Sequence, residues 1–453
     1  MKRLASTAAL ALVVSAVLGV SQPAQAGPRP SGPPGPGFYS TKTPYEPRQD
    51  ARTYRSAPKG FVPVFTESVS RHGSRTSTSS EDGDLILQLW DKAASEGELT
   101  GRGKHFGPEV RSLLDAMEKA GYGNLSGRGK REIQATAVRM HQRLPGLFRQ
   151  IAKDSEPIDV VSSGKDRAVD SGSLFAAALA GADPALKPLI GPARTDKDLL
   201  YFHKADGGAA YRDYLANDQR LAATLKKITD QPATHRAARN VLERIFTPAF
   251  VQRISAGEFS SIGTGIDAAE AVYNLYSIAP TMSDEGTWRM RRYIAPRDAA
   301  WFAYLDDAED FYEKGPGFAD SDITYRMADV LLDDFFEQAE ATRAGTGDVG
   351  AELRFTHAEE IIPLAALMGL PGSTEPAAAR PYTYADNPWR GASVAPMAAN
   401  IQWDVFRKDD TYLVRMLYNE KETAFKRGCE PVAKGSPFYD LDELRRCFGR
   451  TAS

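Results

Sequence analysis

The chain of 453 residues lacks most of the sequence features that mark metalloproteins and membrane proteins. Its two cysteines, Cys429 and Cys447, and its six histidines form no cluster with the spacing of a zinc site. Calcium-binding loops and Walker-type phosphate loops are also missing from the sequence. Only one apolar run, at residues 8–20, approaches the length of a membrane span, and it is too short to be assigned as one. We therefore expect no metal cofactor and no membrane-spanning domain in the mature protein.

The N-terminal segment, residues 1–26, has the three parts of a secretory signal peptide. Lys2 and Arg3 form its charged start, an apolar run forms its centre, and Ala24-Gln25-Ala26 is a small-x-small cleavage site. The alternative is an uncleaved membrane anchor. We expect a soluble protein that is secreted or extracytoplasmic. In an oxidising compartment, the two cysteines are expected to form a disulfide rather than to stay as free thiols.

The charge balance argues against nucleic acid as the main partner. The formal net charge is −3, and loss of the signal segment removes Lys2 and Arg3 but no acidic residue, which leaves −3 − 2 = −5. A mildly acidic protein binds anions only where it has a local basic pocket. We therefore expect a small-molecule partner and no nucleic acid.

Composition and periodicity divide the rest of the chain into three parts. Residues 27–55 are rich in proline, glycine and serine, which predicts a flexible leader. Residues 56–182 and 346–453 combine buried-strand and helix patterns and predict an α/β domain with a mostly parallel central sheet flanked by helices. Residues 183–345 carry helical patterns and few strand signals, which predicts a mainly helical inserted domain.

Individual elements follow from the same patterns. The expected strands are residues 61–65, 158–163, 353–356, 394–406 and 412–418, the last two as an antiparallel pair at the sheet edge. The expected helices are residues 84–94, 108–120, 126–144, 168–180, 209–223, 232–242, 267–277, 299–314, 323–342, 361–370 and 440–448. Ser126 is expected to cap its helix, and Pro363 suits a first helical turn. His203 either lines a cleft or lies in a solvated loop.

The first stretch that carries chemistry is Ser70-Arg71-His72-Gly73-Ser74-Arg75-Thr76, just after a predicted buried strand. Arginine binds phosphate oxygens bidentately, and histidine can attack phosphorus because it is partly unprotonated near neutral pH. Glycine lets the backbone approach a bound anion. Open α/β sheets bind ligands at the carboxyl ends of their strands. Taken alone, however, this stretch is also compatible with a solvated basic loop.

Two later strand ends carry residues of the same kind. Arg167 follows the second predicted strand at the start of a helix, whose free N–H groups attract phosphate. A surface ion pair of Arg167 with Asp166 or Asp170 is the alternative. His357 and Glu359 follow the third predicted strand, again before a helix. Three such junctions together predict one site that handles an anion.

These motifs resemble those of the histidine phosphatase superfamily, in its acid phosphatase and phytase branch. The matching runs are Arg71-His72-Gly73-Ser74-Arg75, Ser162-Ser163-Gly164-Lys165-Asp166-Arg167 and Thr356-His357-Ala358-Glu359, in this order. The His-Ala-Glu form of the third run is similar to the multiple inositol polyphosphate phosphatases. Weaker echoes are Tyr312-Glu313-Lys314-Gly315, Pro381-Tyr382 and Met416-Leu417-Tyr418-Asn419-Glu420-Lys421. The resemblance covers nearly all of the chain after residue 55.

The resemblance implies a phosphomonoesterase that hydrolyses inositol polyphosphates through a phosphohistidine intermediate, and the N-terminal segment adds the expectation that it is secreted. The resemblance also implies that His72 is the nucleophile and that Glu359 protonates the leaving oxygen. The residues implied to hold the phosphate oxygens are Arg71, Arg75, Arg167 and His357. One departure from the family pattern is Ser77, because a proline often stands two residues after the second arginine.

Two other functions stay open at this point. One is a broad-specificity histidine acid phosphatase that acts on sugar phosphates and other monoesters. The other is a non-catalytic protein that binds a phosphate ligand, although such a protein would need neither the nucleophile His72 nor the acid Glu359. Glu359 also has a structural alternative, which is to cap the helix that follows it or to pair with Arg354.

Overall fold

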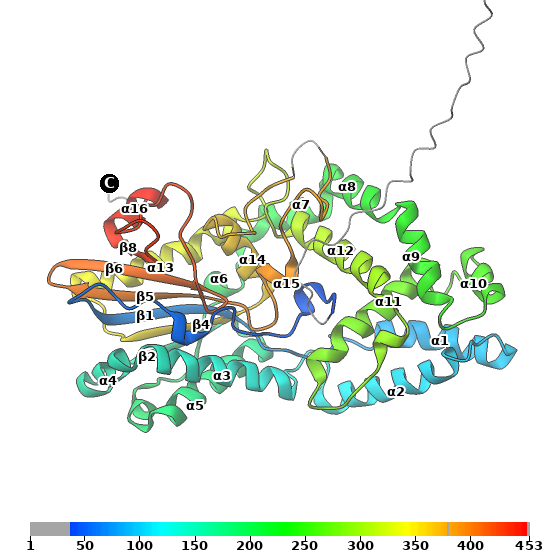
Figure 1. Cartoon of the computed structure of the whole chain (residues 1–453), viewed down its shortest axis with the longest axis horizontal. Coiled ribbons are helices and arrows are strands. Elements are labelled where there is room, and N and C mark those ends of the chain that lie inside the picture. Colours follow the sequence, from blue (N-terminus) through cyan, green and yellow to red (C-terminus); the bar gives the residue numbers. More distant parts are fainter. Residues whose placement is uncertain (1–36, 378–379, 451–453) are drawn as a thin grey trace, which may run out of the picture.

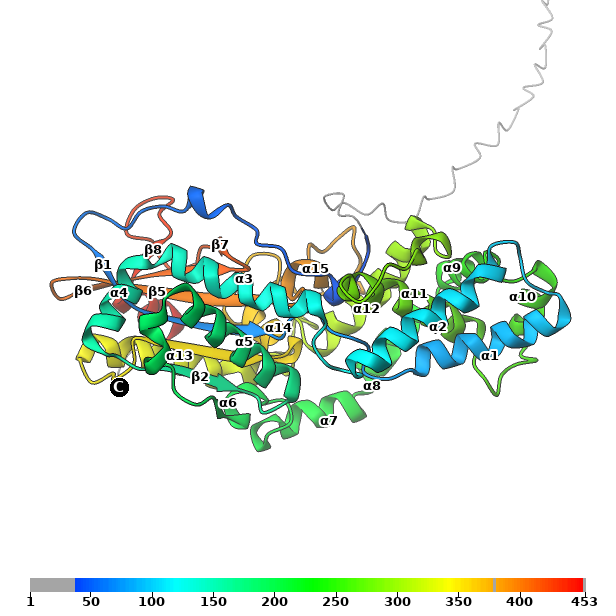
Figure 2. The same cartoon turned by 90° about the horizontal axis from the view of Figure 1, so that it is seen from below.

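The structure, a computed structural model, describes residues 37–377 and 380–450. The predicted signal segment, residues 1–26, lies outside them, as does the first part of the predicted leader. A sheet lies between layers of helices at one end of the molecule, and a group of helices extends beyond the sheet at the other (Figure 1). A second view shows the same elongated arrangement (Figure 2). No helix in the described ranges is long and apolar enough to cross a membrane.

The sheet has eight strands in the order β3-β2-β4-β1-β5-β6-β7, and β8 pairs with β6. They are β1 Val62–Arg71, β2 Ile158–Ser162, β3 Arg194–Thr195, β4 Ala351–Thr356, β5 Asn400–Lys408, β6 Thr411–Tyr418, β7 Lys421–Glu422 and β8 Phe438–Asp440. The four strands from β3 to β1 are parallel, whereas β5 to β8 add antiparallel pairs. The α/β class is confirmed, but the sheet is mixed because the C-terminal hairpin extends it beside β1.

Helices make up the layers around the sheet and the extension beyond it. They are α1 Glu81–Glu96, α2 Gly103–Ala120, α3 Gly127–Arg143, α4 Pro145–Asp154, α5 Asp166–Ala182, α6 Lys197–Leu200, α7 Ala209–Asn217, α8 Gln219–Thr229, α9 Pro232–Leu242, α10 Pro248–Ser255, α11 Gly265–Ile278, α12 Pro296–Glu313, α13 Asp329–Ala344, α14 Ala358–Leu367, α15 Gly391–Val394 and α16 Leu441–Phe448. Short 3₁₀ helices include η1 Ser40–Lys42 and η5 Ala279–Met282. Ser126 caps α3 as predicted, accepting a hydrogen bond from Gly129 N.

Several predicted boundaries were wrong for local reasons. β1 continues to Arg71, well beyond the apolar stretch, because its polar second half finds buried partners across the sheet. The predicted helix at 209–223 is two helices, since the side chain of Asp218 caps α8 through Leu221 N. The predicted strand at 394–406 begins only at residue 400, after α15 and Pro396, which has no N–H for a ladder.

The sheet is covered on both faces by separate apolar clusters. Helices α3, α4 and α5 pack against one face, with Phe148 and Phe175 beside Phe355 of β4. Helices α13, α14 and α16 lie on the other face, where Phe335 and Phe336 pack edge-on against Trp403 of β5. Figure 1 shows these two sets of helices below and above the strands.

The helical extension differs from the predicted insertion at 183–345. Its apolar cluster joins α1 and α2, which were assigned to the α/β domain, with α9, α10 and α11. Conversely, α13 belongs to the layer on the sheet. Helix α12 links both parts, because Phe302 packs in the extension and Phe311 in the cluster on the sheet. The extension is therefore built from two separate stretches of the chain, which composition alone did not reveal.

Residues 37–55, the described part of the predicted flexible leader, are packed against the rest of the molecule. Tyr39 and Tyr45 are buried, and Lys42 Nζ lies 3.0 Å from Asp306 Oδ2 on α12. The prediction was wrong for these residues because their side chains find partners that lie hundreds of residues away in the chain.

Cys429 and Cys447 form the predicted disulfide, with their Cα atoms 5.2 Å apart. The bridge ties the loop after β7 to α16.

Candidate active site

The predicted junctions lie side by side at one edge of the sheet. Arg71, the last residue of β1, is in register with Thr356, the last residue of the parallel strand β4. Strand β2 is the parallel neighbour of β4 on its other side. The imidazole rings of His72 and His357, one residue beyond β1 and β4, have centroids 5.4 Å apart. Parallel pairing thus brings together residues that lie 285 positions apart in the sequence.

His72 is buried, and its ring orientation is fixed by a contact with its neighbour. Its Nδ1 lies 2.9 Å from Gly73 O. Because a carbonyl oxygen can only accept, Nδ1 carries the hydrogen and Nε2 keeps its lone pair. Burial lowers the pKa of His72 well below its usual value, and the charge of Arg71 lowers it further. The ring is therefore neutral near pH 7, with a nucleophilic Nε2.

The loop after His72 packs against α3 and hydrogen-bonds to it. Glu132 accepts hydrogen bonds from Ser74 N at 2.8 Å and from Ser74 Oγ at 2.9 Å. A Cβ on Gly129 would lie 1.9 Å from Ser74 O, and one on Gly73 would lie 2.4 Å from Gly129 O. Only glycine fits at both positions, since the two backbones touch. This close approach leaves the loop after His72 little freedom to move.

The three predicted arginines lie near His72, and their charges lower its pKa. None of them forms an ion pair with a carboxylate in the described part of the chain, and the Nε of each is buried without a hydrogen-bond partner there. Arg71 Nη1 instead donates to two backbone carbonyls, and Arg75 Nη1 donates to Thr76 O. Burial lowers the pKa of Arg71 to about 10 and that of Arg75 to about 9, and the charge of Arg167 adds to both shifts.

His357 stands between β4 and α14. Its Nε2 lies 2.8 Å from Ser163 Oγ at the end of β2, whereas its buried Nδ1 has no hydrogen-bond partner among the described residues. Burial lowers the pKa of His357 to about 3, and the charge of Arg167 lowers it as well. A neutral ring whose Nε2 accepts the Ser163 hydroxyl carries its hydrogen on Nδ1, where it can donate to an anion.

Glu359 lies in the first turn of α14, which begins three residues earlier than predicted and leaves Pro363 in the helix interior rather than in its first turn. Burial raises the pKa of Glu359, but the charge of Lys314 opposes this most strongly, and the pKa lies at about 2. The carboxylate is therefore ionised in the free site.

Glu359 neither caps α14 nor pairs with Arg354, because other residues make these contacts. Its buried neighbour Glu360 accepts hydrogen bonds from His357 N at 3.3 Å and from Thr356 Oγ1 at 2.8 Å, so Glu360 caps the helix. Arg354 pairs with Glu67, at 3.0 Å, rather than with Glu359.

Sequence reasoning missed several residues around these groups. Lys314, in one of the weaker echoes of the family, lies next to Glu359 at the end of α12 and forms an ion pair of 2.6 Å with Asp310. His203 is buried, with Nδ1 2.5 Å from Glu360 Oε1, so it does not lie in a solvated loop. Glu132 gave no signal, because it lies on an ordinary amphipathic helix.

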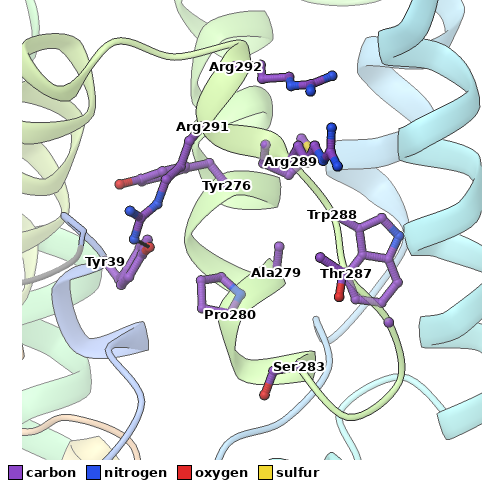
Figure 3. A pocket seen from close by; sticks show the side chains of 12 residues that line it. Tyr39, Tyr276, Ala279, Pro280, Ser283, Thr287, Trp288, Arg289, Arg291 and Arg292 are labelled. Carbon is purple, nitrogen blue, oxygen red and sulfur yellow. Dashed lines mark hydrogen bonds between the residues drawn. The ribbon is translucent and has the colours of Figure 1, made fainter.

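A separate cavity of about 470 Å³ lies between α11 and the loop that follows it (Figure 3). It is lined by aromatic and basic side chains that include Tyr39, Tyr276, Trp288 and Arg291. None of the predicted site residues lines it. The described residues also contain no group of three or more His, Cys, Asp or Glu side chains that could hold a metal ion.

Comparisons with known proteins agree with this geometry. The model of the histidine phosphatase superfamily, branch 2, matches residues 65–419. The crystal structure of the Bifidobacterium longum multiple inositol polyphosphate phosphatase in complex with inositol hexasulfate superposes with a TM-score of 0.86. That protein is 36% identical, over 91% of this chain and 97% of the other.

More distant relatives also match over most of the chain. The multiple inositol polyphosphate phosphatase 1 of Gallus gallus is 23% identical over 410 residues, which cover 86% of this chain and 84% of the relative. A phytase from D. castellii is only 15% identical, over 91% of this chain and 84% of the phytase, yet has a TM-score of 0.60. The match over most of the length, together with the paired histidines at two adjacent strand ends, shows that this chain belongs to the histidine phosphatase superfamily, branch 2, in the group of the multiple inositol polyphosphate phosphatases.

Proposed function

We propose that this protein hydrolyses the phosphate monoesters of inositol polyphosphates through a phosphohistidine intermediate on His72. The observation that carries the proposal is the state of that ring. Its Nδ1 hydrogen is held by Gly73 O, its pKa is lowered, and three arginines without carboxylate partners in the described chain lie near it. This arrangement suits a nucleophile whose substrate is a dianion.

In the first step, Nε2 of His72 forms a bond to phosphorus while the bond from phosphorus to the inositol oxygen breaks. The oxygens of the transferred group are held by the arginines and by the Nδ1 hydrogen of His357. Phosphoryl transfer depends mainly on such positioning and on neutralisation of the oxygen charges. In the second step, water attacks phosphorus and the bond to Nε2 breaks, which releases inorganic phosphate.

Glu359 supplies the proton that the leaving inositol oxygen needs. It is ionised in the free site, with a pKa of about 2, so it must gain its proton as the substrate binds. A bound phosphate brings negative charge beside the carboxylate and offsets Lys314, and both effects raise its pKa. After the first transfer, the carboxylate can take a proton from the attacking water.

Inositol polyphosphates suit the positive charge of this site better than simple monoesters do. Lys165 lies at the site edge, with Nζ 5.6 Å from the ring centre of Tyr201, whose ring centre is 5.4 Å from that of His357. Cations outside the central phosphate position would attract further phosphates on one ring. The complex of the Bifidobacterium longum relative with inositol hexasulfate supports the same substrate class.

The substrate assignment is tested by comparing the rates of phosphate release from different substrates. The wild-type protein is incubated with inositol hexakisphosphate and, in parallel, with glucose 6-phosphate, glycerol phosphate and p-nitrophenyl phosphate, and His72→Ala serves as the matched inactive control. We expect the highest kcat/KM with inositol hexakisphosphate. Equal kcat/KM across the panel would replace the proposal with a broad-specificity acid phosphatase, and no phosphate release from any substrate would replace it with a binding protein.

We further propose that the protein is exported by its first 26 residues. The Cys429–Cys447 disulfide supports an oxidising compartment. N-terminal sequencing of the protein recovered from the medium or the cell envelope should start at Gly27. Recovery of the intact chain from the cytoplasm alone would contradict export.

A further inference from the structure

Arg71 is held by two segments that come from opposite ends of the chain. Its Nη1 donates to Thr41 O and to Ala395 O, both at 2.6 Å. Because both hydrogens of Nη1 are engaged, the edge formed by Nε and Nη2 is the one that can take two phosphate oxygens. Nε is buried and has no hydrogen-bond partner among the described residues. The two carbonyls therefore set the orientation of a phosphate-binding edge.

One buried carboxylate joins these two segments. Asp307 of α12 is 1% exposed, and its Oδ1 accepts from Ser40 Oγ at 2.5 Å and from Gly391 N at 3.1 Å. Ser40 precedes Thr41 in η1, and Gly391 begins α15, which ends one residue before Ala395. The single oxygen Oδ1 thus binds both segments whose carbonyls hold Arg71.

The surroundings of this carboxylate leave little room for adjustment. A Cβ on Gly391 would lie 2.6 Å from Asp307 Oδ1 and 2.8 Å from Thr41 Cγ2, so the two segments and α12 meet at this glycine. The Oδ2 atom of Asp307 accepts from Tyr384 OH at 2.5 Å. Ser40 has a φ of 47°, which is unfavourable for a residue with a side chain and persists only where contacts enforce it.

We propose that Asp307 is a positioning residue for Arg71. It acts through Thr41 and Ala395 and does not touch the substrate. This inference rests on the proposed function, because it assumes that Arg71 binds the transferred phosphate. Helix α12 is where the apolar cluster of the helical extension meets that of the sheet. The proposal therefore gives the helical extension a part in aligning the nucleophile site.

The test compares Asp307→Ala with two matched variants. Asp307→Asn keeps an Oδ1 acceptor for Ser40 and Gly391, and its amide can donate to the Tyr384 oxygen. This variant should therefore keep the activity and the phosphate affinity of the wild type. Asp306→Ala removes the same charge from the next residue of α12, and it also loses a contact to η1 through Lys42. Activity on p-nitrophenyl phosphate, competitive inhibition by inorganic phosphate and thermal stability are measured for each variant.

For Asp307→Ala we expect kcat/KM to fall roughly ten- to a hundred-fold, because a small displacement of a binding group has a large effect on transfer. The inhibition constant of phosphate should rise about tenfold, the size of one weakened charge-assisted hydrogen bond. Asp307→Asn and Asp306→Ala should stay within about threefold of wild type in both quantities. Ser40→Ala should shift them in the same direction by a smaller amount, and it serves if Asp307→Ala fails to fold.

A double-mutant cycle with Arg71→Ala separates the possible outcomes. If Asp307 acts through Arg71, Asp307→Ala causes no further loss of phosphate affinity in the Arg71→Ala background. Equal phosphate inhibition constants for wild type, Ser40→Ala and Asp307→Ala would overturn the proposal, even if thermal stability falls. Failure of Arg71→Ala itself to weaken phosphate would instead overturn the proposed role of Arg71.

Discussion

Two groups of buried arginines in this molecule differ in whether a carboxylate pairs with them. Inside the sheet, Arg354 of β4 pairs with Glu67 of β1 at 3.0 Å and lies close to two further carboxylates, those of Glu352 and Asp334. At the strand ends a few residues away, the arginines around His72 have no carboxylate partner in the described chain. Burial lowers the pKa in both groups, but the carboxylates raise the pKa of Arg354 above its usual value, while that of Arg75 falls to about 9.

The difference separates a structural charge from a functional one. A buried ion is costly unless a partner compensates it within the chain. The Arg354 cluster is compensated, so its role ends with the fold. In the candidate site, Arg71 and Arg75 donate to carbonyl oxygens and form no ion pair with a carboxylate in the described chain. In the function proposed above, an incoming phosphate completes their coordination. This comparison predicts opposite effects of mutation on activity and stability in the two groups.

The largest effect is expected at His72, the proposed nucleophile. His72→Ala should reduce kcat by on the order of 10⁴–10⁶ while the protein stays folded. Rapid quenching of the wild-type enzyme into alkaline denaturant should trap phosphate on His72, and the variant should trap none. Normal turnover by a folded His72→Ala protein would exclude the phosphohistidine mechanism.

The next largest effect is expected for Glu359, whose carboxylate opposes the positive charge of the site. Glu359→Gln should reduce the first turnover of inositol hexakisphosphate by on the order of 10²–10⁴, because an inositol alkoxide needs a proton to leave. Nitrophenolate leaves without one, so the first turnover of p-nitrophenyl phosphate should change far less. Rapid-quench kinetics on both substrates measure the difference.

The matched control is Glu360→Gln, which alters the buried cap while leaving Glu359 in place. Equal losses of first-turnover rate on both substrates would mean that Glu359 is not the acid.

Arg75→Met tests the functional side of the comparison directly. Loss of one charged donor to the transferring group should lower kcat/KM by on the order of 10²–10³. Stability should rise at pH 7, since burial and the neighbouring charges disfavour the protonated form of Arg75 in the fold. Its pKa is about 9 when folded and higher when unfolded, so the cost is full below pH 9 and fades above it.

Chemical denaturation at pH 7 and pH 10 measures this shift, and the gain in stability should shrink at the higher pH. A loss of stability at pH 7 would show that Arg75 has structural partners after all.

Arg354→Met should have the reverse pattern. Glu67 would be left as a buried carboxylate without its arginine, which should lower the free energy of unfolding by about 3–5 kcal/mol. The kcat of the folded fraction should change little, because the Arg354 guanidinium packs against Asp334 and Phe335 of α13. Adding Glu67→Gln to the variant should recover part of the lost stability. A strong loss of kcat in well-folded Arg354→Met would break the distinction between the two groups.

The sequence predicted the position of the candidate site better than the contacts that support it. The three strand-to-helix junctions could be predicted because the residues of each are consecutive in the sequence. A sequence motif therefore shows all of them at once. Asp307 and Glu132 were missed because they act through backbone atoms of residues far away in the chain, and such contacts leave no motif. The second half of β1 was missed because Glu67 is polar, and its partner Arg354 lies on a strand 287 residues later.

The smallest effect on activity is expected for the Cys429–Cys447 disulfide, which joins the loop after β7 to α16 and contacts neither group of arginines. The bridge closes a loop of 18 residues and should contribute ~3 kcal/mol to stability, chiefly by restricting the unfolded chain. Cys429→Ser/Cys447→Ser should therefore unfold at lower denaturant concentration while keeping the wild-type kcat at 25 °C.

Helix α16 should stay in place without the bridge, because Leu441, Leu444 and Phe448 remain packed in the apolar cluster on the sheet. Urea titration followed by tryptophan fluorescence measures the loss, and activity measured on the same samples shows whether it reaches the site. A large fall in kcat before the unfolding transition would mean that α16 supports the catalytic junction, and the division between structural and functional regions would then have to be redrawn.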